Sequence, residues 1–368
     1  MRILFSGRPA YGHLYPLLPL AFAARAAGHG VVFATGADFV PRISALGLDT
    51  REAGVSVGVA EAEAVRRHPN GPVVDVLVTM FADLLPRRTL PDVHYLISQV
   101  KPDLVVYEMS DVGAAGAARR AGVPCVSVTI GRSMPADILA AAAPHLDWIW
   151  NSHRPADPML GDAVVDLWPD AIADRGARAV PTRFPLRPDP WSPPGPWTSP
   201  GTPLVYLTLG TVSFGATHVF RAAIDGLASL PVQVVVATGP GDPAALGPVP
   251  GNVHVEGFVP QAQVLRDAAL VVHHGGSGTT LGAAALGLPQ LILPQGADQF
   301  VNAEALSAQG SALSLVGDDL SPDAVAACAL ALLGEPVHRA TAEALRSEIA
   351  AMPSLADVLA GLERFALS

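Results

Sequence analysis

Short apolar runs alternate with longer, helix-forming stretches along the whole chain. Apolar runs bounded by Gly, Pro or Asp are typical of strands buried in a parallel sheet, and the stretches between them are long enough for helices. The alternation therefore predicts repeated βαβ units. In the first half, the predicted strands cover residues 2–5, 31–34, 49–52, 103–107 and 123–130.

The second half of the chain repeats this pattern after a proline-dense segment. Residues 181–203 contain too many prolines for a helix or a central strand, and they predict a semi-rigid linker. The strands predicted beyond it cover residues 204–208, 232–237, 252–255, 269–272, 290–293 and 314–316. We therefore expect an α/β protein in which two Rossmann-like domains, at residues 1–181 and 204–352, are joined by a linker at residues 182–203. A C-terminal helix at residues 353–368 is free to pack back on the first domain.

Residues 271–302 combine two strand ends with a glycine turn. The first strand ends at His273 and His274, and the turn at residues 275–278 leads into an alanine-rich helix. Glycines let a ligand approach the backbone closely, and the unpaired N–H groups at the start of a helix favour a phosphate. Asp298 and Gln299 follow the next strand and offer hydrogen-bonding groups to sugar hydroxyls. The stretch therefore predicts a site for a phosphate-bearing ligand.

The same stretch also fits a dinucleotide fingerprint, although weakly. Gly276, Gly278 and Gly282 have a similar spacing, and Asp298 follows about 20 residues further on. In that fingerprint the acidic residue ends the next strand, whereas Asp298 follows a further loop. The spacing alone therefore does not establish a dinucleotide site.

The composition argues against several kinds of partner and site. The chain has 368 residues, 50% of them hydrophobic, and a formal net charge of −10, which argues against nucleic acid or an anionic membrane as a partner. Cys125 and Cys328 cannot form a disulfide framework, and no apolar run suits a secretory signal or a spanning helix. His273 and His274 point to opposite faces of a strand, so they do not form a shared metal site. We expect a cytoplasmic protein that binds no metal.

Polar residues also follow two strand ends in the first half. Gly12 and His13 lie in the predicted loop after the first strand, and Glu108 comes directly after the strand at residues 103–107. Ligands of open parallel sheets bind at the carboxyl ends of strands, where His can act as a general base and a carboxylate can orient its imidazole. The alternative for His13 is a loop histidine that only caps a helix. For Glu108, the alternatives are that Asp111 holds the imidazole or that this segment only caps the next helix.

Taken together, these motifs resemble the GT-B glycosyltransferases that decorate natural products, in particular the actinobacterial enzymes acting on antibiotic aglycones. The resemblance spans the whole chain and implies two Rossmann-like domains that face each other across a cleft. It implies inverting, metal-independent transfer of a sugar from a TDP-sugar or UDP-sugar to a hydroxyl of a hydrophobic small molecule. It rests on GHLYP at residues 12–16, PDLVVYE at 102–108, LGT at 209–211, GFVPQ at 257–261, and on His273, Asp298 and Gln299.

The resemblance also implies roles for individual residues. His13 would deprotonate the acceptor hydroxyl, and Glu108, which stands where many relatives have Asp, would hold the imidazole. Phe258 would stack on the donor base, and Val259 would meet it through its backbone. The other residues implied for the donor site are Thr211, His273, Ser277, Gly278 and Thr279 around the diphosphate, Asp298 and Gln299 at the sugar hydroxyls, and Gln261, Gly275 and Gly276.

Apolar residues of the first half predict the acceptor surface. Met80, Phe81, Met134 and Trp148 supply apolar and aromatic area of the kind that lines sites for large ligands. Ordinary core packing is the alternative for each of them.

Three other functions remain open from the sequence. A nucleotide-sugar epimerase of this fold would convert the donor without an acceptor. A non-catalytic, glycosyltransferase-like partner protein would bind a donor and never turn it over, and an NAD-dependent dehydrogenase would bind NAD. The resemblance favours TDP over UDP and leaves open the sugar, the aglycone and the existence of a homodimer.

Overall fold

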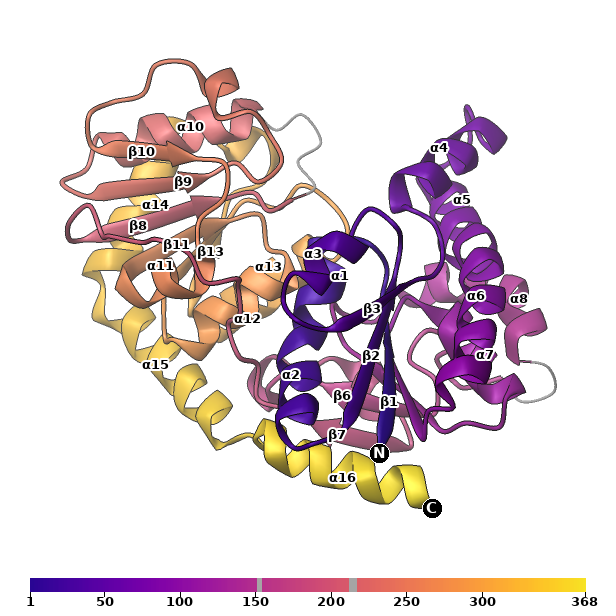
Figure 1. Ribbon diagram of the computed structural model, residues 1–368. Coiled ribbons are helices and arrows are strands. Elements are labelled where there is room, and N and C mark those ends of the chain that lie inside the picture. Colours follow the sequence, from indigo (N-terminus) through magenta and orange to yellow (C-terminus); the bar gives the residue numbers. More distant parts are fainter. Residues whose placement is uncertain (151–153, 212–216) are drawn as a thin grey trace. The chain divides into compact units, whose positions relative to one another are not determined.

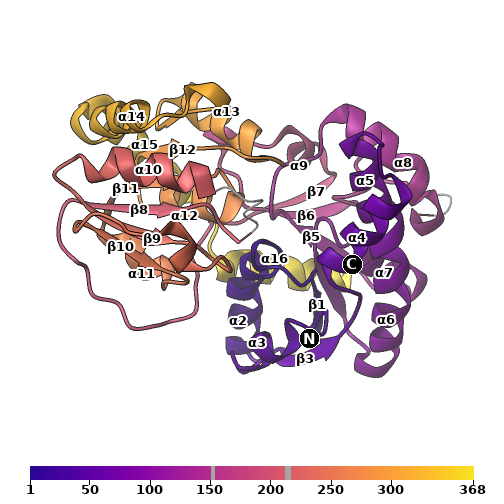
Figure 2. The same cartoon turned by 90° about the horizontal axis from the view of Figure 1, so that it is seen from above.

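The computed structural model spans the chain and describes residues 1–150, 154–211 and 217–368 (Figures 1 and 2). The chain forms two compact units. The first unit consists of Met1–Leu167, Asp174–Leu186 and Pro353–Ser368, and the second consists of Trp168–Ala173 and Arg187–Met352.

Among the described residues, the first unit has a seven-stranded parallel sheet in the order β3-β2-β1-β4-β5-β6-β7. Its strands are β1 (Arg2–Ser6), β2 (Gly30–Thr35), β3 (Asp49–Glu52), β4 (Leu104–Glu108), β5 (Cys125–Val128), β6 (Ala163–Asp166) and β7 (Thr182–Pro185). Its α-helices are α1 (Tyr11–Leu14), α2 (Leu18–Ala26), α3 (Val40–Ser44), α4 (Val57–Arg67), α5 (Val73–Val78), α6 (Leu85–Val100), α7 (Val112–Arg120), α8 (Ala136–Trp150), α9 (Arg175–Ala179) and α16 (Leu355–Leu367).

The core of the first unit lies between its sheet and the helices on either face. Buried residues of β1 and β4, including Leu4 and Val105, pack against α6, α7 and α8 on one face. The C-terminal helix α16 packs beside α2 (Figure 1), where His29 and Glu363 form an ion pair of 2.9 Å. The last helix of the chain is therefore part of the first unit.

The second unit repeats the architecture with a six-stranded parallel sheet in the order β10-β9-β8-β11-β12-β13. Its strands are β8 (Leu204–Thr208), β9 (Gln233–Ala237), β10 (Val253–Glu256), β11 (Ala268–His273), β12 (Gln290–Ile292) and β13 (Ala312–Ser314). Its α-helices are α10 (Thr217–Ala228), α11 (Gln261–Asp267), α12 (Ser277–Ala285), α13 (Gln299–Gln309), α14 (Pro322–Gly334) and α15 (Pro336–Ala351). The expected pair of parallel α/β sheets is confirmed.

The strand registers bring functional loops to the same sheet edges. In the first sheet Ser6 lies opposite Tyr107, so the loop after β1 leaves the sheet beside the end of β4. In the second sheet Thr208 lies opposite His273, and His273 lies opposite Ile292. The loops after β8, β11 and β12 therefore leave the sheet next to one another.

Two strands of the first sheet are missing from the sequence prediction. β6 is four buried residues long, too short to stand out as an apolar run. Residues 182–185 are predicted as linker, but they form β7 at the edge of the sheet and end in Pro185. An edge strand tolerates proline because its missing N–H removes no ladder hydrogen bond.

The sequence predicts that residues 73–100 are mostly helical but interrupted by Pro86 and Pro91, and the structure is more continuous than that. Pro86 lies in the first turn of α6, where its missing N–H is harmless, and Pro91 is accommodated inside that helix. Residues Thr79–Leu84 form a π-helical turn, η2, between α5 and α6. Such turns occur frequently at functional sites. The sequence also predicts a turn at residues 209–215, part of which lies outside the described residues, and it does not predict α4.

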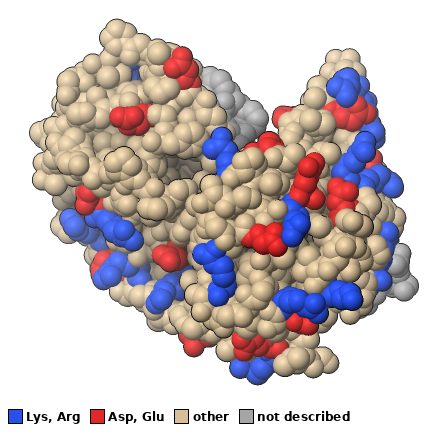
Figure 3. All heavy atoms as spheres, in the orientation of Figure 1, with Lys and Arg blue, Asp and Glu red and all other residues tan. Residues whose placement is uncertain are grey.

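Two further properties concern membrane-spanning helices and surface charge. No helix among the described residues has the length and apolar character needed to cross a bilayer. On the face drawn in Figure 3, acidic and basic side chains are interspersed, without a continuous basic patch.

The packing of α10 against α14 gives a first testable prediction. A Cβ on Gly226 would lie 2.4 Å from the carbonyl oxygen of Pro322 and 2.9 Å from Cβ of Val325. Gly226→Ala should therefore destabilise the protein by about 1–3 kcal/mol, as overpacking usually does. Urea unfolding followed by circular dichroism measures the change.

Gly334→Ala is the matched control for this substitution. Gly334 ends α14, and a Cβ there would meet nothing within 4 Å. Its stability should be unchanged or about 0.5–1 kcal/mol higher, because alanine costs less chain entropy than glycine. Equal unfolding midpoints for the two variants would contradict the tight approach of the two helices.

Candidate active site

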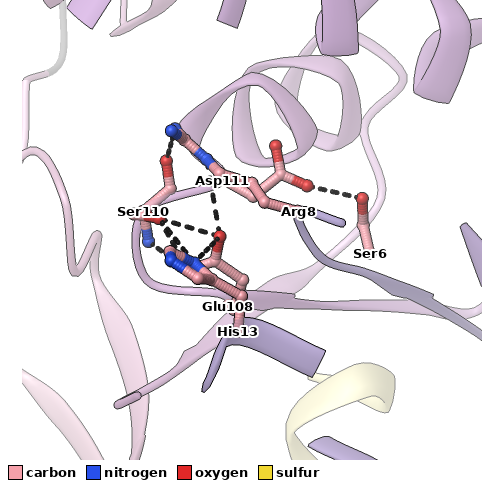
Figure 4. A network of polar contacts seen from close by, with 6 residues as sticks. All are labelled: Ser6, Arg8, His13, Glu108, Ser110 and Asp111. Atoms are coloured by element: carbon pink, nitrogen blue, oxygen red, sulfur yellow. Dashed lines mark hydrogen bonds and ion pairs between the residues drawn. The ribbon is translucent and has the colours of Figure 1, made fainter. Parts of the chain in front are cut away.

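The candidate site of the first unit is a histidine paired with a buried carboxylate. His13 lies in the last turn of the short helix α1, where the sequence predicts a loop, and Glu108 is the last residue of β4. Nδ1 of His13 is 3.0 Å from Oε1 of Glu108 (Figure 4). The side chain of Glu108 is fully buried, whereas that of His13 is 23% exposed. The imidazole can therefore meet a ligand while the carboxylate cannot.

Glu108 is held by several donors besides His13. The backbone N–H of Ser110 donates to Oε2 at 2.7 Å, and the Ser110 hydroxyl lies 2.8 Å from both carboxylate oxygens. Nε of the buried Arg8 is 3.5 Å from Oε1. Burial raises the pKa of Glu108, but His13, Arg8 and the Ser110 backbone together lower it below its usual 4.5.

These contacts fix the tautomer of His13. An ionised carboxylate only accepts hydrogen bonds, so Nδ1 of a neutral His13 carries the proton. Nε2 is then the basic nitrogen. The pair can therefore accept a proton at Nε2 and stabilise the resulting imidazolium.

Asp111, the alternative partner of His13, faces a different residue. Its Oδ2 accepts a hydrogen bond of 2.7 Å from the hydroxyl of Ser6 on β1. It occupies the N-cap position of α7 without a side-chain capping bond among the described residues. Burial raises the pKa of Asp111 to about 6. Glu108, rather than Asp111, is the carboxylate in contact with His13.

The second unit has a candidate site of its own, at the glycine turn after β11. α12 starts at Ser277, and its N-cap, Gly276, provides no side-chain capping bond among the described residues. The first-turn N–H groups of a helix have no intrahelical partner, and the helix dipole favours an anion there. Gly278 is exposed, and a Cβ on it would meet nothing within 4 Å. A phosphate can thus approach this end of α12, which Ser277, Gly278 and Thr279 form.

His273, which the resemblance assigns to the surroundings of the diphosphate, lies at the buried end of β11. It is fully buried, with Nε2 2.8 Å from Oε1 of Gln290 and Nδ1 accepting from the N–H of Gly275 at 3.0 Å. Burial, together with the neighbouring His274, lowers the pKa of His273 to about 3. Both ring nitrogens are hydrogen-bonded, so this neutral histidine connects the glycine turn to Gln290 on β12.

His274 lies instead between two glycine loops. A Cβ on Gly210 would be 2.5 Å from Cε1 of His274, and a Cβ on Gly276 would be 2.4 Å from its Nε2. Burial lowers the pKa of His274 to about 4, against an opposing effect of the Thr208 backbone. The glycines after β8 and β11 are therefore needed to make room for this ring.

The predicted sugar clamp is tied to the helix start. Oδ2 of Asp298 accepts from the hydroxyl of Ser277 at 2.9 Å and from Nδ2 of Asn302 at 3.2 Å. Oε1 of Gln299 accepts from the N–H groups of Gln295 at 2.7 Å and Gly296 at 3.1 Å. The structure thus brings Asp298 next to α12, while the carbonyl end of the Gln299 side chain holds its own loop.

Asn302 is a site residue that the sequence patterns miss. Its buried amide donates to the carbonyl oxygen of Gly275 at 2.8 Å and lies 3.3 Å from the hydroxyl of Ser277. With its bond to Asp298, this one amide links the glycine turn, the start of α12 and the start of α13. A single asparagine within a helix carries no sequence signal for such a role.

The remaining predicted donor residues follow neighbouring strands of the second sheet. Phe258, 56% exposed, and the half-buried Val259 follow β10, and Gln261 starts α11 and accepts from the hydroxyl of Tyr206 at 3.2 Å. Thr211 is half-buried and is the last described residue before residue 217. All of them belong to the second unit.

The four predicted acceptor residues have different surroundings. Phe81, in η2, lies under the guanidinium of Arg8 at 4.6 Å, which links it to the His13 site. Met80 is buried in a core cluster and Met134 packs against another. The ring of Trp148 lies between the guanidinium groups of Arg87 and Arg120. Finally, the described residues contain no group of three or more His, Cys, Asp or Glu side chains placed to hold a metal ion.

Comparison with known proteins places this geometry in a family. Residues 221–365 match the family described as the erythromycin biosynthesis protein CIII-like, C-terminal domain. The chain is 34% identical to L-demethylnoviosyl transferase of Streptomyces niveus, over 98% of this chain and 97% of that protein. The chain belongs to the glycosyltransferases of antibiotic biosynthesis. It is also 31% identical to the elloramycin glycosyltransferase ElmGT of Streptomyces olivaceus, over 98% of this chain and 97% of the relative.

Solved structures agree with this assignment. The glycosyltransferase VinC, determined in complex with dTDP, superposes with a TM-score of 0.76 at 26% identity, covering 100% of this chain and 99% of VinC. This glycosyltransferase therefore has the GT-B fold that the motifs predict.

The glycine turn of this glycosyltransferase gives a second prediction. Gly276→Ala should weaken the binding of TDP and lower the unfolding temperature, because a Cβ would collide with His274. Gly278→Ala, with open space around it, should leave the unfolding temperature unchanged and still weaken TDP binding by about tenfold or more, since a phosphate held by this end of α12 would have to approach the backbone there. Calorimetry and thermal unfolding measure the two effects. TDP binding at the wild-type level by Gly278→Ala would contradict a phosphate site at this end of α12.

Proposed function

We propose that this glycosyltransferase transfers a deoxysugar from a TDP-sugar to a hydroxyl of a small natural-product aglycone, in one inverting displacement. The observation that carries the proposal is the pairing of the part-exposed His13 with the fully buried, ionised Glu108 at 3.0 Å. A carboxylate–imidazole pair of this kind is the arrangement that activates a hydroxyl by general-base catalysis.

In the proposed reaction, Nε2 of His13 removes the proton of the acceptor hydroxyl. The acceptor oxygen forms a bond to the anomeric carbon of the sugar, and the bond from that carbon to the diphosphate breaks. Glu108 stabilises the imidazolium that forms. The proton is then lost to solvent, and the nucleoside diphosphate leaves.

The second unit would hold the donor. The start of α12 would stabilise the negative charge that develops on the leaving diphosphate, because preorganised N–H donors act strongly on such charge. This role requires no metal ion. Binding of dTDP by VinC supports a thymidine nucleotide as the donor, with a UDP-sugar as the alternative.

The acceptor class follows from the relatives and from the first unit. L-demethylnoviosyl transferase and elloramycin glycosyltransferase are named for a sugar and an antibiotic, which supports an aglycone acceptor here. Phe81 is the predicted acceptor residue that the structure connects to His13, through Arg8 and Glu108. We propose that this aromatic surface helps to bind the aglycone.

His13→Ala tests the proposed base. Turnover should fall by about 10²–10⁴-fold, the usual contribution of a general base. TDP binding, measured by calorimetry, should remain at the wild-type level because the nucleotide is assigned to the other unit. Product formation is measured by mass spectrometry with a TDP-sugar and a panel of aglycones.

His94→Ala is the control for this substitution. His94 is an exposed histidine on α6, so its replacement should leave both turnover and TDP binding unchanged. Turnover by His13→Ala within about twofold of the wild type, far less than a base contributes, would contradict the assignment.

A further inference from the structure

A buried arginine lies close to the two carboxylates at the end of β4, Glu108 and Asp111. Arg8 is in the loop between β1 and α1, and only 3% of its side chain is exposed. Its Nε is 3.5 Å from Oε1 of Glu108, and Nη2 donates to the carbonyl oxygen of Ser110. In Figure 4 the guanidinium lies beside the Ser110 carbonyl and near Glu108, while the Asp111 carboxylate points toward Ser6. One cation therefore faces two buried carboxylates.

The charged and polar groups near Arg8 come from several elements of the first unit. Glu108 lies on β4, Ser110 and Asp111 lie in the loop after β4, and His13 lies on α1. Ser6 of β1 donates to Asp111, and Thr89 of α6 also bonds to that carboxyl group. Phe81 of η2 covers the guanidinium at 4.6 Å. These neighbours exclude water from the cation.

We propose that Arg8 is a positioning residue of the catalytic pair, which keeps Glu108 anionic and aimed at His13 in preference to Asp111. The proposal rests on the proposed function, because it takes His13 as the base.

The preference follows from the contacts of the two carboxylates. Glu108 receives the ion pair with Arg8, the hydrogen bonds of Ser110 and the contact with His13. Asp111 also feels the charge of Arg8, but it forms no ion pair with it among the described residues, it receives hydroxyl groups instead, and one of its oxygens has no hydrogen-bond partner there. A buried charge without partners is costly, so the carboxylate with more hydrogen bonds and ion pairs is the one that stays ionised. The opposite pKa shifts of Glu108, which is lowered, and Asp111, which is raised to about 6, agree with this order.

Arg8 also acts on geometry. Its bond to the Ser110 carbonyl fixes the short loop whose N–H and hydroxyl donate to Glu108. The same loop therefore restrains the carboxylate that holds His13. A lysine would keep the charge but could not reach Glu108 and the Ser110 carbonyl with one planar fork.

The experiment follows the titration of the His13 ring by NMR in the full-length protein, with His13→Gln used to identify its signals. It requires neither donor nor acceptor. Arg8→Met should move the midpoint to higher pH by about 1 unit, the lower end of the effect of one charge at 4–6 Å. Without the cation, both Glu108 and His13 take up protons more readily. Arg8→Lys should recover most of this shift.

A second pair of variants covers the case in which Arg8→Met does not fold. Arg8→Met/Asp111→Asn removes one charge of each sign, and it is compared with Asp111→Asn alone. The same upward shift is expected between these two proteins. A midpoint that moves by less than about 0.3 units in the folded proteins, or a shift that Arg8→Lys does not reverse, overturns the proposal. Unfolding of both proteins that carry Arg8→Met also overturns it, because Arg8 would then serve the fold.

The inference and the proposed function fail separately. If His13→Ala were active, His13 would not be the base, but the effect of Arg8 on the His13 titration could still be observed in the proteins that keep His13. An unresponsive titration would remove the role of Arg8 and leave the loss of turnover in His13→Ala unaffected.

Discussion

A carboxylate buried away from water is the constraint on which the first unit depends. Glu108 is fully buried, and it stays ionised because His13, Arg8 and Ser110 replace its hydration. Each of these residues is placed by the sheet, since β1 and β4 are neighbours and their loops leave the same edge. The carboxylate in turn fixes the tautomer of His13 and leaves one basic nitrogen for a substrate. The hydrogen bond between His13 and Glu108 therefore both orients the imidazole and keeps its Nε2 basic.

The second unit solves a different problem with the same topology. In the proposed function it holds an anion, and the groups available for this are the backbone N–H groups at the start of α12 rather than charged side chains. The glycines after β8 and β11 admit His274, and Asn302 locks the turn to α13. A net charge of −10 is compatible with this arrangement because the anion site is local. In the proposed function, the first unit thus supplies the base and the second unit holds the donor.

The sequence predicts those parts of this molecule that are governed by local pattern. The apolar runs locate most strands of both sheets, and strand ends followed by glycine or polar residues locate His13, Glu108 and the turn before α12. Long-range contacts decide the rest. Adjacent His273 and His274 are equivalent by pattern, yet burial against Gln290 makes the first a scaffold residue. Arg8 and Asn302 act through partners about 100 and 27 residues away, which no local spacing reveals.

The central claim is a single displacement in which the His13–Glu108 pair removes the acceptor proton. The most direct measurement is the configuration of the anomeric carbon in the product, determined by NMR, with a TDP-sugar donor of known configuration and any aglycone that the enzyme glycosylates. A single displacement predicts inversion at that carbon. Retention would contradict the account, because one displacement by the acceptor from the face opposite the leaving diphosphate can only invert that carbon.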